Sequence, residues 1–306
     1  QAPRVVNAAI RHAVELSGVS VISLPGDVSD LKATSPSPKY VPSRRPVLSP
    51  NEEDVRQLAD VLNRAKKVAI FAGAGVEGAH DEVIELADVL KAPIGHTLRG
   101  KDFIQYDNPF DVGMTGLLGY GAAAEGMNDA DVLIMLGTDF PYDQFLPDTF
   151  TVQVENHPEK LGRRTDISLP IHSDVKPLIA ALLPLLDRDR SDAFLKAKVK
   201  KHSKIMHSPI GAYTRNAEHM KPIHPEYAAH ILNEVASKDA IFTADTGMCN
   251  VWTARYIDPL GTRRLIGSFL HGSMANALPH AIGAQVAFPN RQVISVSGDG
   301  GLSMLL

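Results

Sequence analysis

Short apolar runs alternate with helical patterns along most of this chain of 306 residues. Strands alternating with helices favour a parallel sheet with helices on both faces, so the fold class we predict is α/β, with doubly wound domains. The predicted strands of the central region are Val68–Phe71, Pro93–Gly95, Val132–Leu136, Thr151–Val154 and Ile167–Ile171. Its predicted helices begin at Asn51, a typical capping residue, and cover Asp81–Leu90 and Asp174–Leu185.

A second α/β pattern begins at Ile223, after a polar and partly basic stretch. We interpret the lysines of that stretch as a solvated helical face and linker, with an anion-binding patch as the alternative. The predicted strands of the second pattern are Ala240–Thr243, Arg264–Ile266 and Gln292–Val296, with a helix over Ser273–Ala287.

The ends of the chain predict incomplete domains. A helix (Pro3–Leu16) and a strand (Val19–Leu24) are too little to form a domain, and the chain stops inside an apolar run. We therefore expect cuts through folded structure at both ends. The predicted parts are a domain tail over 1–30, a Pro-rich linker over 31–50, a central domain over 51–186, a linker over 187–220 and the start of another domain over 221–306.

Composition excludes several classes of protein. A net charge of −4 argues against a nucleic-acid partner, which would need a basic surface. We find no signal peptide and no apolar run long enough to span a bilayer. The only cysteine, Cys249, cannot form an intrachain disulfide, so we expect a reducing, cytoplasmic setting and a packing role for this residue.

A glycine-flanked carboxylate follows the last predicted strand, in the run Gly298-Asp299-Gly300-Gly301. Parallel strands present ligands at their carboxyl ends, and a carboxylate there suits a hard cation that bridges to phosphate oxygens. The glycines would let backbone N–H groups approach a diphosphate. The alternative is a simple turn in which Asp299 bonds its own backbone.

The segment from Phe269 to Ala277 reads Phe-Leu-His-Gly-Ser-Met-Ala-Asn-Ala, a loop that enters a helix of small residues. Small side chains permit close approach of a ligand, and a helix N-terminus favours anions. Met274 would be an apolar knob at this entry, and a tightly packed core helix is the alternative.

Gly73, Gly75 and Gly78 fit the GxGxxG dinucleotide fingerprint after a strand. A nicotinamide site would also need an acidic residue at the end of the next strand. That strand ends instead at Gly95-His96-Thr97, which disfavours an ordinary nicotinamide site.

Together these motifs resemble the thiamine-diphosphate enzymes. Gly272-Ser273-Met274, the Ala-rich helix and Gly298–Gly301 resemble their diphosphate-binding domain, and Asp245-Thr246-Gly247 resembles its upstream cofactor-facing loop. The resemblance implies that Asp299 binds Mg²⁺ and that Met274 braces the bent cofactor. The implied thiamine-diphosphate contacts are Asp245, Gly272, Ser273, Met274, Asp299, Gly300 and Gly301.

Within that family the chain is most similar to FAD-dependent, quinone-linked pyruvate dehydrogenases, also called pyruvate oxidases. The runs that carry this likeness are 96–101, 107–116, 136–142 and 263–269. The implied FAD contacts are Gly73, Gly75, His96, Thr97, Leu98, Arg99, Gly119, Tyr120, Gly121, Ala122, Ala123, Gly137, Glu155 and Asp174. Two positions depart from the family pattern: Glu155 stands where an Asp is usual, and Ser173 precedes Asp174 where a Gly is usual.

The resemblance implies oxidation of pyruvate to acetate and CO₂, with thiamine diphosphate, Mg²⁺ and FAD as cofactors and a quinone as electron acceptor. It also implies a homo-oligomer, a tetramer in this family, with peripheral association at the inner face of the cell membrane. The family's cofactor-activating Glu, its second Mg²⁺ ligand and its membrane-associating tail would lie outside these residues, so we expect this stretch alone to be inactive.

Three alternatives stay open at this point. Acetolactate synthase and phosphate-dependent pyruvate oxidase share these domains. A nucleotide-sensing or structural α/β module without catalysis is the alternative from another class.

Overall fold

The structure is a computed structural model that describes residues 2–16, 18–32, 41 and 45–305. Much of the predicted linker, at 33–40 and 42–44, lies outside these residues. The chain forms two compact units, Gln1–Val47 and Leu48–Leu306.

The described residues of the first unit form two helices, α1 (Ala2–Glu15) and α2 (Gly26–Ser29). The helix predicted over Pro3–Leu16 is confirmed, but the strand predicted over Val19–Leu24 is wrong. Val19 and Val21 are 92% and 89% exposed, and no described strand pairs with this segment. Alternating apolar residues make a strand only when a neighbouring strand takes up their backbone hydrogen bonds.

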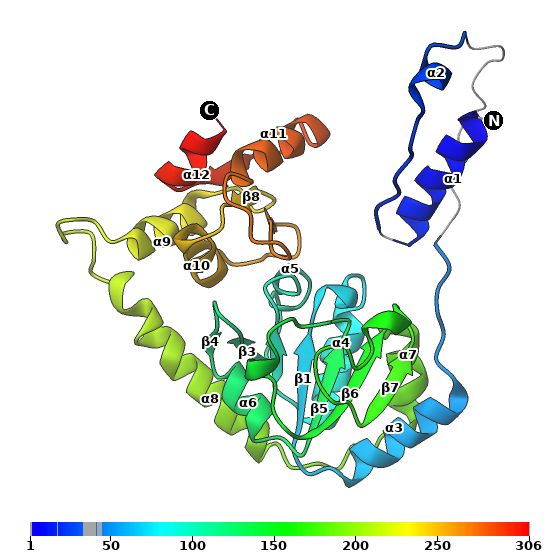
Figure 1. The fold of residues 1–306 in the computed structure, drawn as a ribbon. Helices are drawn as coiled ribbons and strands as arrows, with labels where there is room; N and C mark the ends of the chain where they lie inside the picture. The colour runs from blue at the N-terminus through cyan, green and yellow to red at the C-terminus, as the bar shows by residue number, and fades with distance from the viewer. Residues whose placement is uncertain (1, 17, 33–40, 42–44, 306) are drawn as a thin grey trace. The chain divides into compact units, whose positions relative to one another are not determined.

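A seven-stranded sheet forms the centre of the second unit, in the order β4-β3-β2-β1-β5-β6-β7 (Figure 1). All neighbours pair in parallel except β3 and β4, which form an antiparallel edge. The strands are β1 (Val68–Ala72), β2 (Ile94–His96), β3 (Asp111–Met114), β4 (Tyr120–Gly121), β5 (Val132–Leu136), β6 (Phe150–Glu155) and β7 (Leu169–His172). The parallel α/β class is therefore confirmed.

Helices cover both faces of this sheet. On one face, α3 (Glu52–Arg64), α4 (His80–Leu90) and α7 (Val175–Leu182) bury a core against alternate strand residues such as Ile70 and Ile134. On the other face, α6 (Ala123–Asn128) and the start of α8 (Ala193–His207) pack near the intervening residues, Phe71 among them. Because successive side chains of a strand point to opposite faces, β1 and β5 are buried on both.

A smaller parallel sheet, in the order β10-β8-β9, follows along the chain. Its strands are β8 (Ile241–Ala244), β9 (Arg264–Gly267) and β10 (Val293–Val296), and its helices are α9 (Pro225–Val235), α10 (Met248–Tyr256), α11 (Ala277–Ala287) and α12 (Asp299–Met304). Phe242, Ala244 and Leu265 form its core with residues of α9 and of the chain after α10.

The structure adds elements that the sequence did not predict. Strands β3 and β4 were missed, as were the short helices α5 (Lys101–Ile104) and α12. Helix α11 begins at Ala277, not at Ser273, because residues before it form a loop in which Ala275 has a φ of +61°.

Helix α8 occupies much of the stretch predicted as a linker, and its lysines are largely paired. Lys198 is 5% exposed and its Nζ contacts the carboxylates of Glu125 and Asp129 on and beside α6. Lys196 pairs with Asp192, and Lys201 pairs with Glu125. These pairs favour the structural interpretation of the basic stretch over an anion-binding patch.

Replacing Lys198 by Ala should destabilise the second unit by about 1–3 kcal/mol, because two carboxylates would lose the cation between them. Lys200→Ala, at an exposed position of the same helix, is the matched control and should change the free energy of unfolding by less than about 0.5 kcal/mol. Urea unfolding of both variants makes the comparison, and equal midpoints would show that Lys198 does not hold α8 in place.

Candidate functional site

Three loops meet at the carboxyl ends of the strands of the smaller sheet. Residues 245–247 follow β8, residues 268–276 follow β9, and residues 298–301 follow β10. Because the strands are parallel, all three loops leave the same edge of the sheet. The structure thus brings together the segments that the sequence predicted as contacts of thiamine diphosphate.

Asp245 is the buried carboxylate of this edge, with 2% of the residue exposed. Its Oδ1 accepts hydrogen bonds from the Ala277 amide at 2.9 Å and from Asn276 Nδ2 at 3.3 Å. Its Oδ2 has no hydrogen-bond partner within the described residues. Asp245 therefore positions the start of α11 rather than facing solvent.

The loop before α11 is fixed by side-chain-to-backbone bonds. Asn276 Oδ1 accepts from the Ser268 amide at 3.0 Å, and Asn276 Nδ2 donates to the Ser273 carbonyl at 2.6 Å. Thr246 Oγ1 donates to the same carbonyl at 2.8 Å, joining the β8 loop to the β9 loop. Met274 is 49% exposed, and its Cε lies 3.6 Å from the place that a Cβ on Gly300 would take.

Sequence reasoning missed Asn276 and Ser268, although they hold this loop together. An Asn directly before a run of small helical residues is a capping signal that could have singled out Asn276. Ser268 carries no comparable local signal.

Asp299 begins α12, is exposed, and within the described residues its carboxylate has no hydrogen bond or ion pair. The alternative in which it caps a turn through its own backbone is therefore not supported. No group of three or more His, Cys, Asp or Glu residues in the described part of the chain could hold a metal by itself. A cation at Asp299 would need further oxygen ligands, such as those of a diphosphate.

In the central domain, three predicted FAD glycines pack against one another at the carboxyl ends of β1 and β5. The Gly75 amide donates to the Gly137 carbonyl at 3.0 Å, and a Cβ on Gly75 would lie 2.5 Å from Gly137 Cα. A Cβ on Gly73 would lie 2.4 Å from the Gly137 carbonyl oxygen. The chain crosses from one half of the sheet to the other between these strands, where ligands of such sheets collect.

The predicted flavin segment after β2 has one buried and one exposed end. His96 is fully buried, and its Nδ1 lies 3.1 Å from the Thr97 carbonyl. Thr97 Oγ1 accepts from the Gly100 amide at 3.0 Å. Leu98 packs against the core of the smaller sheet, and Arg99 is exposed with no hydrogen bond or ion pair among the described residues.

The predicted contacts from Gly119 to Ala123 do not all reach this edge. The Gly119 carbonyl accepts from Arg255 at 3.2 Å, and Tyr120 and Gly121 pair with β3. Because β4 runs antiparallel, Ala122 and Ala123 lead away from the edge and are buried beside Val112. The structure does not bring these two alanines together with the other predicted FAD residues.

Glu155 is the last residue of β6, and Asp174 follows the neighbouring strand β7. Glu155 Oε1 accepts from the amides of Asn156 at 3.0 Å and His157 at 3.3 Å. Asp174 Oδ1 accepts from Asn156 Nδ2 at 2.7 Å, and its Oδ2 accepts from the Leu48 amide at 2.8 Å. These bonds use Glu155 Oε1, and Oε2 has no hydrogen bond to another described residue.

A cavity of about 510 Å³ lies between the central domain and the smaller sheet, a size usual for ligand sites. The central domain lines it with residues 114–118, Leu98, Phe140 and Tyr142, and the smaller sheet with residues 246–248, 250–251 and 268–272. The cavity is therefore bounded by both the predicted flavin segment and the predicted thiamine-diphosphate loops.

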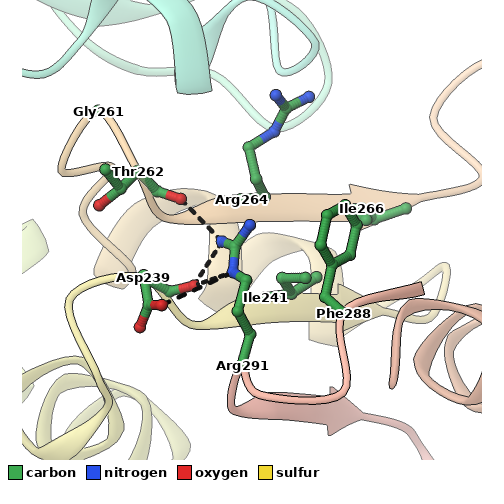
Figure 2. A pocket seen from close by; sticks show the side chains of 8 residues that line it. All are labelled: Asp239, Ile241, Gly261, Thr262, Arg264, Ile266, Phe288 and Arg291. Carbon is green, nitrogen blue, oxygen red and sulfur yellow. Dashed lines mark hydrogen bonds and ion pairs between the residues drawn. The ribbon is translucent and has the colours of Figure 1, made fainter. Parts of the chain in front are cut away.

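A second cavity, of about 550 Å³, lies at the opposite, amino-terminal edge of the smaller sheet (Figure 2). There Arg291 donates hydrogen bonds to the backbone oxygens of Asp239 and Thr262. Because these bonds occupy Arg291, and because ligands of parallel sheets collect at the other edge, we do not place a cofactor in this cavity.

Residues 55–182 match the thiamine pyrophosphate enzyme central domain, and residues 245–306 match the thiamine pyrophosphate enzyme C-terminal TPP-binding domain. Thiamine pyrophosphate is another name for thiamine diphosphate. The chain belongs to the thiamine pyrophosphate enzyme family.

Three relatives show the range of this family. The chain is 34% identical over 309 residues to YdaP of Bacillus subtilis, whose name describes a thiamine pyrophosphate-containing protein (99% of this chain, 53% of the relative). It is 28% identical over 322 residues to an acetolactate synthase of Mycobacterium bovis (99% and 51%). It is 27% identical over 313 residues to a pyruvate oxidase of Lactiplantibacillus plantarum (99% and 51%). The chain spans about half the length of these relatives.

Gly301→Ala should disrupt the site, because a Cβ at this position would lie 2.1 Å from Asp245 Oδ2. Overpacking of this kind costs about 1–3 kcal/mol, and here it would push apart the loops after β8 and β10. Gly283→Ala, at an exposed position of α11 outside the predicted site, is the control, since its Cβ would meet nothing within 4 Å. Thermal melts and thiamine-diphosphate titrations should show loss for Gly301→Ala alone; equal behaviour of the two would contradict the close contact.

Acid should destabilise the central domain through two histidines. Burial lowers the pKa of both His96 and His202 below 6.5, although the nearby Asp111 acts in the opposite direction. Below that pH the unfolded chain binds more protons than the folded one, so the free energy of unfolding should fall as the pH falls. Urea unfolding from about pH 7.5 to about pH 5.5 should show a shallower decline for His202→Gln than for wild type; parallel curves would refute this.

Proposed function

We propose that the protein containing this chain oxidises pyruvate to acetate and CO₂ with thiamine diphosphate, Mg²⁺ and FAD, and passes the electrons to a quinone. The observation that carries this proposal is the cavity bounded by Leu98 on one side and by the loops after β8 and β9 on the other. It would bring a flavin ring and a thiazolium ring within reach of one substrate.

The residues after the smaller sheet fit a diphosphate and its cation. Asp299 offers an exposed carboxylate that no other described residue binds, and its neighbours Gly298 and Gly300 carry no side chains. Asp245 fixes the start of α11, while the exposed Met274 side chain, beside Gly300, would brace the bound cofactor. When bound, thiamine diphosphate supplies the carbon nucleophile and the electron sink for loss of CO₂.

The carboxyl edge of the central sheet supports FAD through fewer contacts than the sequence predicted. Arg99 offers an exposed guanidinium, unpaired among the described residues, for a flavin carbonyl or a phosphate, and Leu98 offers an apolar surface in the cavity. Glu155 Oε2 would accept from the adenosine ribose. His96, Ala122 and Ala123 would act by packing and not by touching the cofactor.

Acetolactate synthase is the second candidate function, because relatives with that name are as similar to this chain as the pyruvate oxidase is. The proposal further includes a homo-oligomer, cytoplasmic location and peripheral contact with the inner face of the membrane. No helix of the described residues is long and apolar enough to span a bilayer.

Product analysis of the intact protein distinguishes the candidates. We expect pyruvate, thiamine diphosphate, Mg²⁺ and a quinone analogue to give acetate and CO₂ without added phosphate, and the purified protein to show a flavin spectrum. Acetolactate as the main product would transfer the assignment to the synthase. Acetyl phosphate would transfer it to the phosphate-dependent oxidase, and absence of turnover with all cofactors bound would favour a non-catalytic module.

Asp299→Ala should abolish Mg²⁺-dependent binding of thiamine diphosphate while FAD stays bound, because the two sites lie in different domains. Titration of the cofactor into the intact wild type and variant, with and without Mg²⁺, measures this directly. Asp143→Ala, at an exposed carboxylate of the central domain, serves as the control and should bind as wild type does. Equal affinities of wild type and Asp299→Ala would remove Asp299 from the metal site.

A further inference from the structure

Strand β9 has one edge paired with β8 and one edge open within the described sheet. The Arg264 amide donates to the Ala240 carbonyl before β8, so the next amide, that of Leu265, points to the open edge. An unpaired edge amide needs a partner when it is buried. Here the partner comes from the central domain.

Asp102 of α5 supplies that partner, although it lies 163 positions away in the sequence. Its Oδ2 accepts the Leu265 amide at 2.7 Å and lies 3.4 Å from Arg264 Nε. The side chain of Asp102 is 9% exposed. Burial raises its pKa, and the Leu265 hydrogen bond and Arg264 both act in the opposite direction.

A second contact supports the same junction. The Arg264 guanidinium lies 4.6 Å from the centre of the Phe103 ring, the residue after Asp102. Figure 2 shows the Arg264 side chain leaving β9 away from Asp239 and Thr262. Arg264 therefore reaches the central domain and does not join the bonds of Arg291.

On its central side, the junction is tied to the end of β1. The Thr97 amide donates to the Ala72 carbonyl at 2.9 Å, and a Cβ on Gly100 would lie 2.5 Å from the same oxygen. Asp102 is thus held close to the end of β1. On the other side, Leu265 lies three positions before Ser268, which bonds to Ser273 and Asn276 of the thiamine-diphosphate loop.

We propose that Asp102 is a positioning residue that sets the thiamine-diphosphate loop after β9 from within the central domain. Its hydrogen bond to the Leu265 amide fixes the position of β9 relative to the proposed flavin segment. The loop from Ser268 to Asn276 follows β9 directly and is therefore positioned with it. This inference rests on the proposed thiamine-diphosphate site. If Asp102 has this role, binding of thiamine diphosphate at the small sheet should stabilise residues 97–104. Order in residues 97–104 should in turn strengthen binding of the cofactor.

Thiamine-diphosphate titrations of the intact protein test this role. Asp102→Ala should weaken affinity roughly tenfold, because a buried amide and a cation lose their acceptor. Asp102→Asn keeps an oxygen for the Leu265 amide and should stay within about threefold of wild type. Glu77→Gln is the control, since Glu77 lies 3.8 Å from Arg264 at an exposed position; it should bind as wild type does.

The outcomes separate positioning from mere stability. A lower melting temperature of Asp102→Ala with unchanged cofactor affinity would overturn the proposal, as would an Asp102→Asn variant as weak as Asp102→Ala. Failure of the wild type to bind thiamine diphosphate would overturn the proposed function together with this role. Wild-type binding that Asp102→Ala leaves unchanged would overturn this role alone.

Hydrogen exchange of the wild-type protein tests the coupling between the two segments without any substitution. In wild type, adding thiamine diphosphate and Mg²⁺ should slow amide exchange in residues 97–104 of the central domain as well as in residues 264–276. Slower exchange confined to residues 264–276 would overturn the coupling, even if Asp102→Ala fails to fold.

Discussion

Parallel strand pairing is the constraint on which the rest of this molecule depends. It sends the loops after β1, β2, β5, β6 and β7 to one edge of the large sheet, and the loops after β8, β9 and β10 to one edge of the small sheet. No loop needs to be long to reach its neighbours. The chemistry proposed here follows from two such edges meeting at one cavity, and not from any single residue of unusual reactivity.

Side chains of the central domain contact both the core and the backbone of the small sheet. Leu98 packs against the core of the small sheet, and the Asp102 carboxylate accepts a hydrogen bond from the Leu265 amide of its edge strand. Because the Leu265 amide and the Asp102 carboxylate are both buried, their hydrogen bond favours one relative position of the two domains. A movement of β9 would therefore expose the Leu265 amide and the Asp102 carboxylate at the same time.

The sequence predicted the strands that a local pattern of apolar residues determines. The strand over Val132–Leu136 was predicted with its observed bounds, because a fully buried parallel strand is a continuous apolar run. Strands β3 and β4 contain glycines and were missed, and Val19–Leu24 was wrong because pairing is not a local property. The bonds of Asp174 to Leu48 and of Asp102 to Leu265 join distant partners, so no spacing in the sequence could have indicated how these two carboxylates are used.

The contact between Gly75 and Gly137 has an evolutionary consequence. Each glycine excludes a Cβ on the other, so a side chain at either position requires both strand-end loops to retreat. A single substitution of either glycine by a larger residue creates a clash. Such a residue could be accepted only after a compensating change in the opposite loop. Changes in the two loops, whose glycines are 62 positions apart, must therefore occur together in evolution, even though neither glycine contributes a functional group.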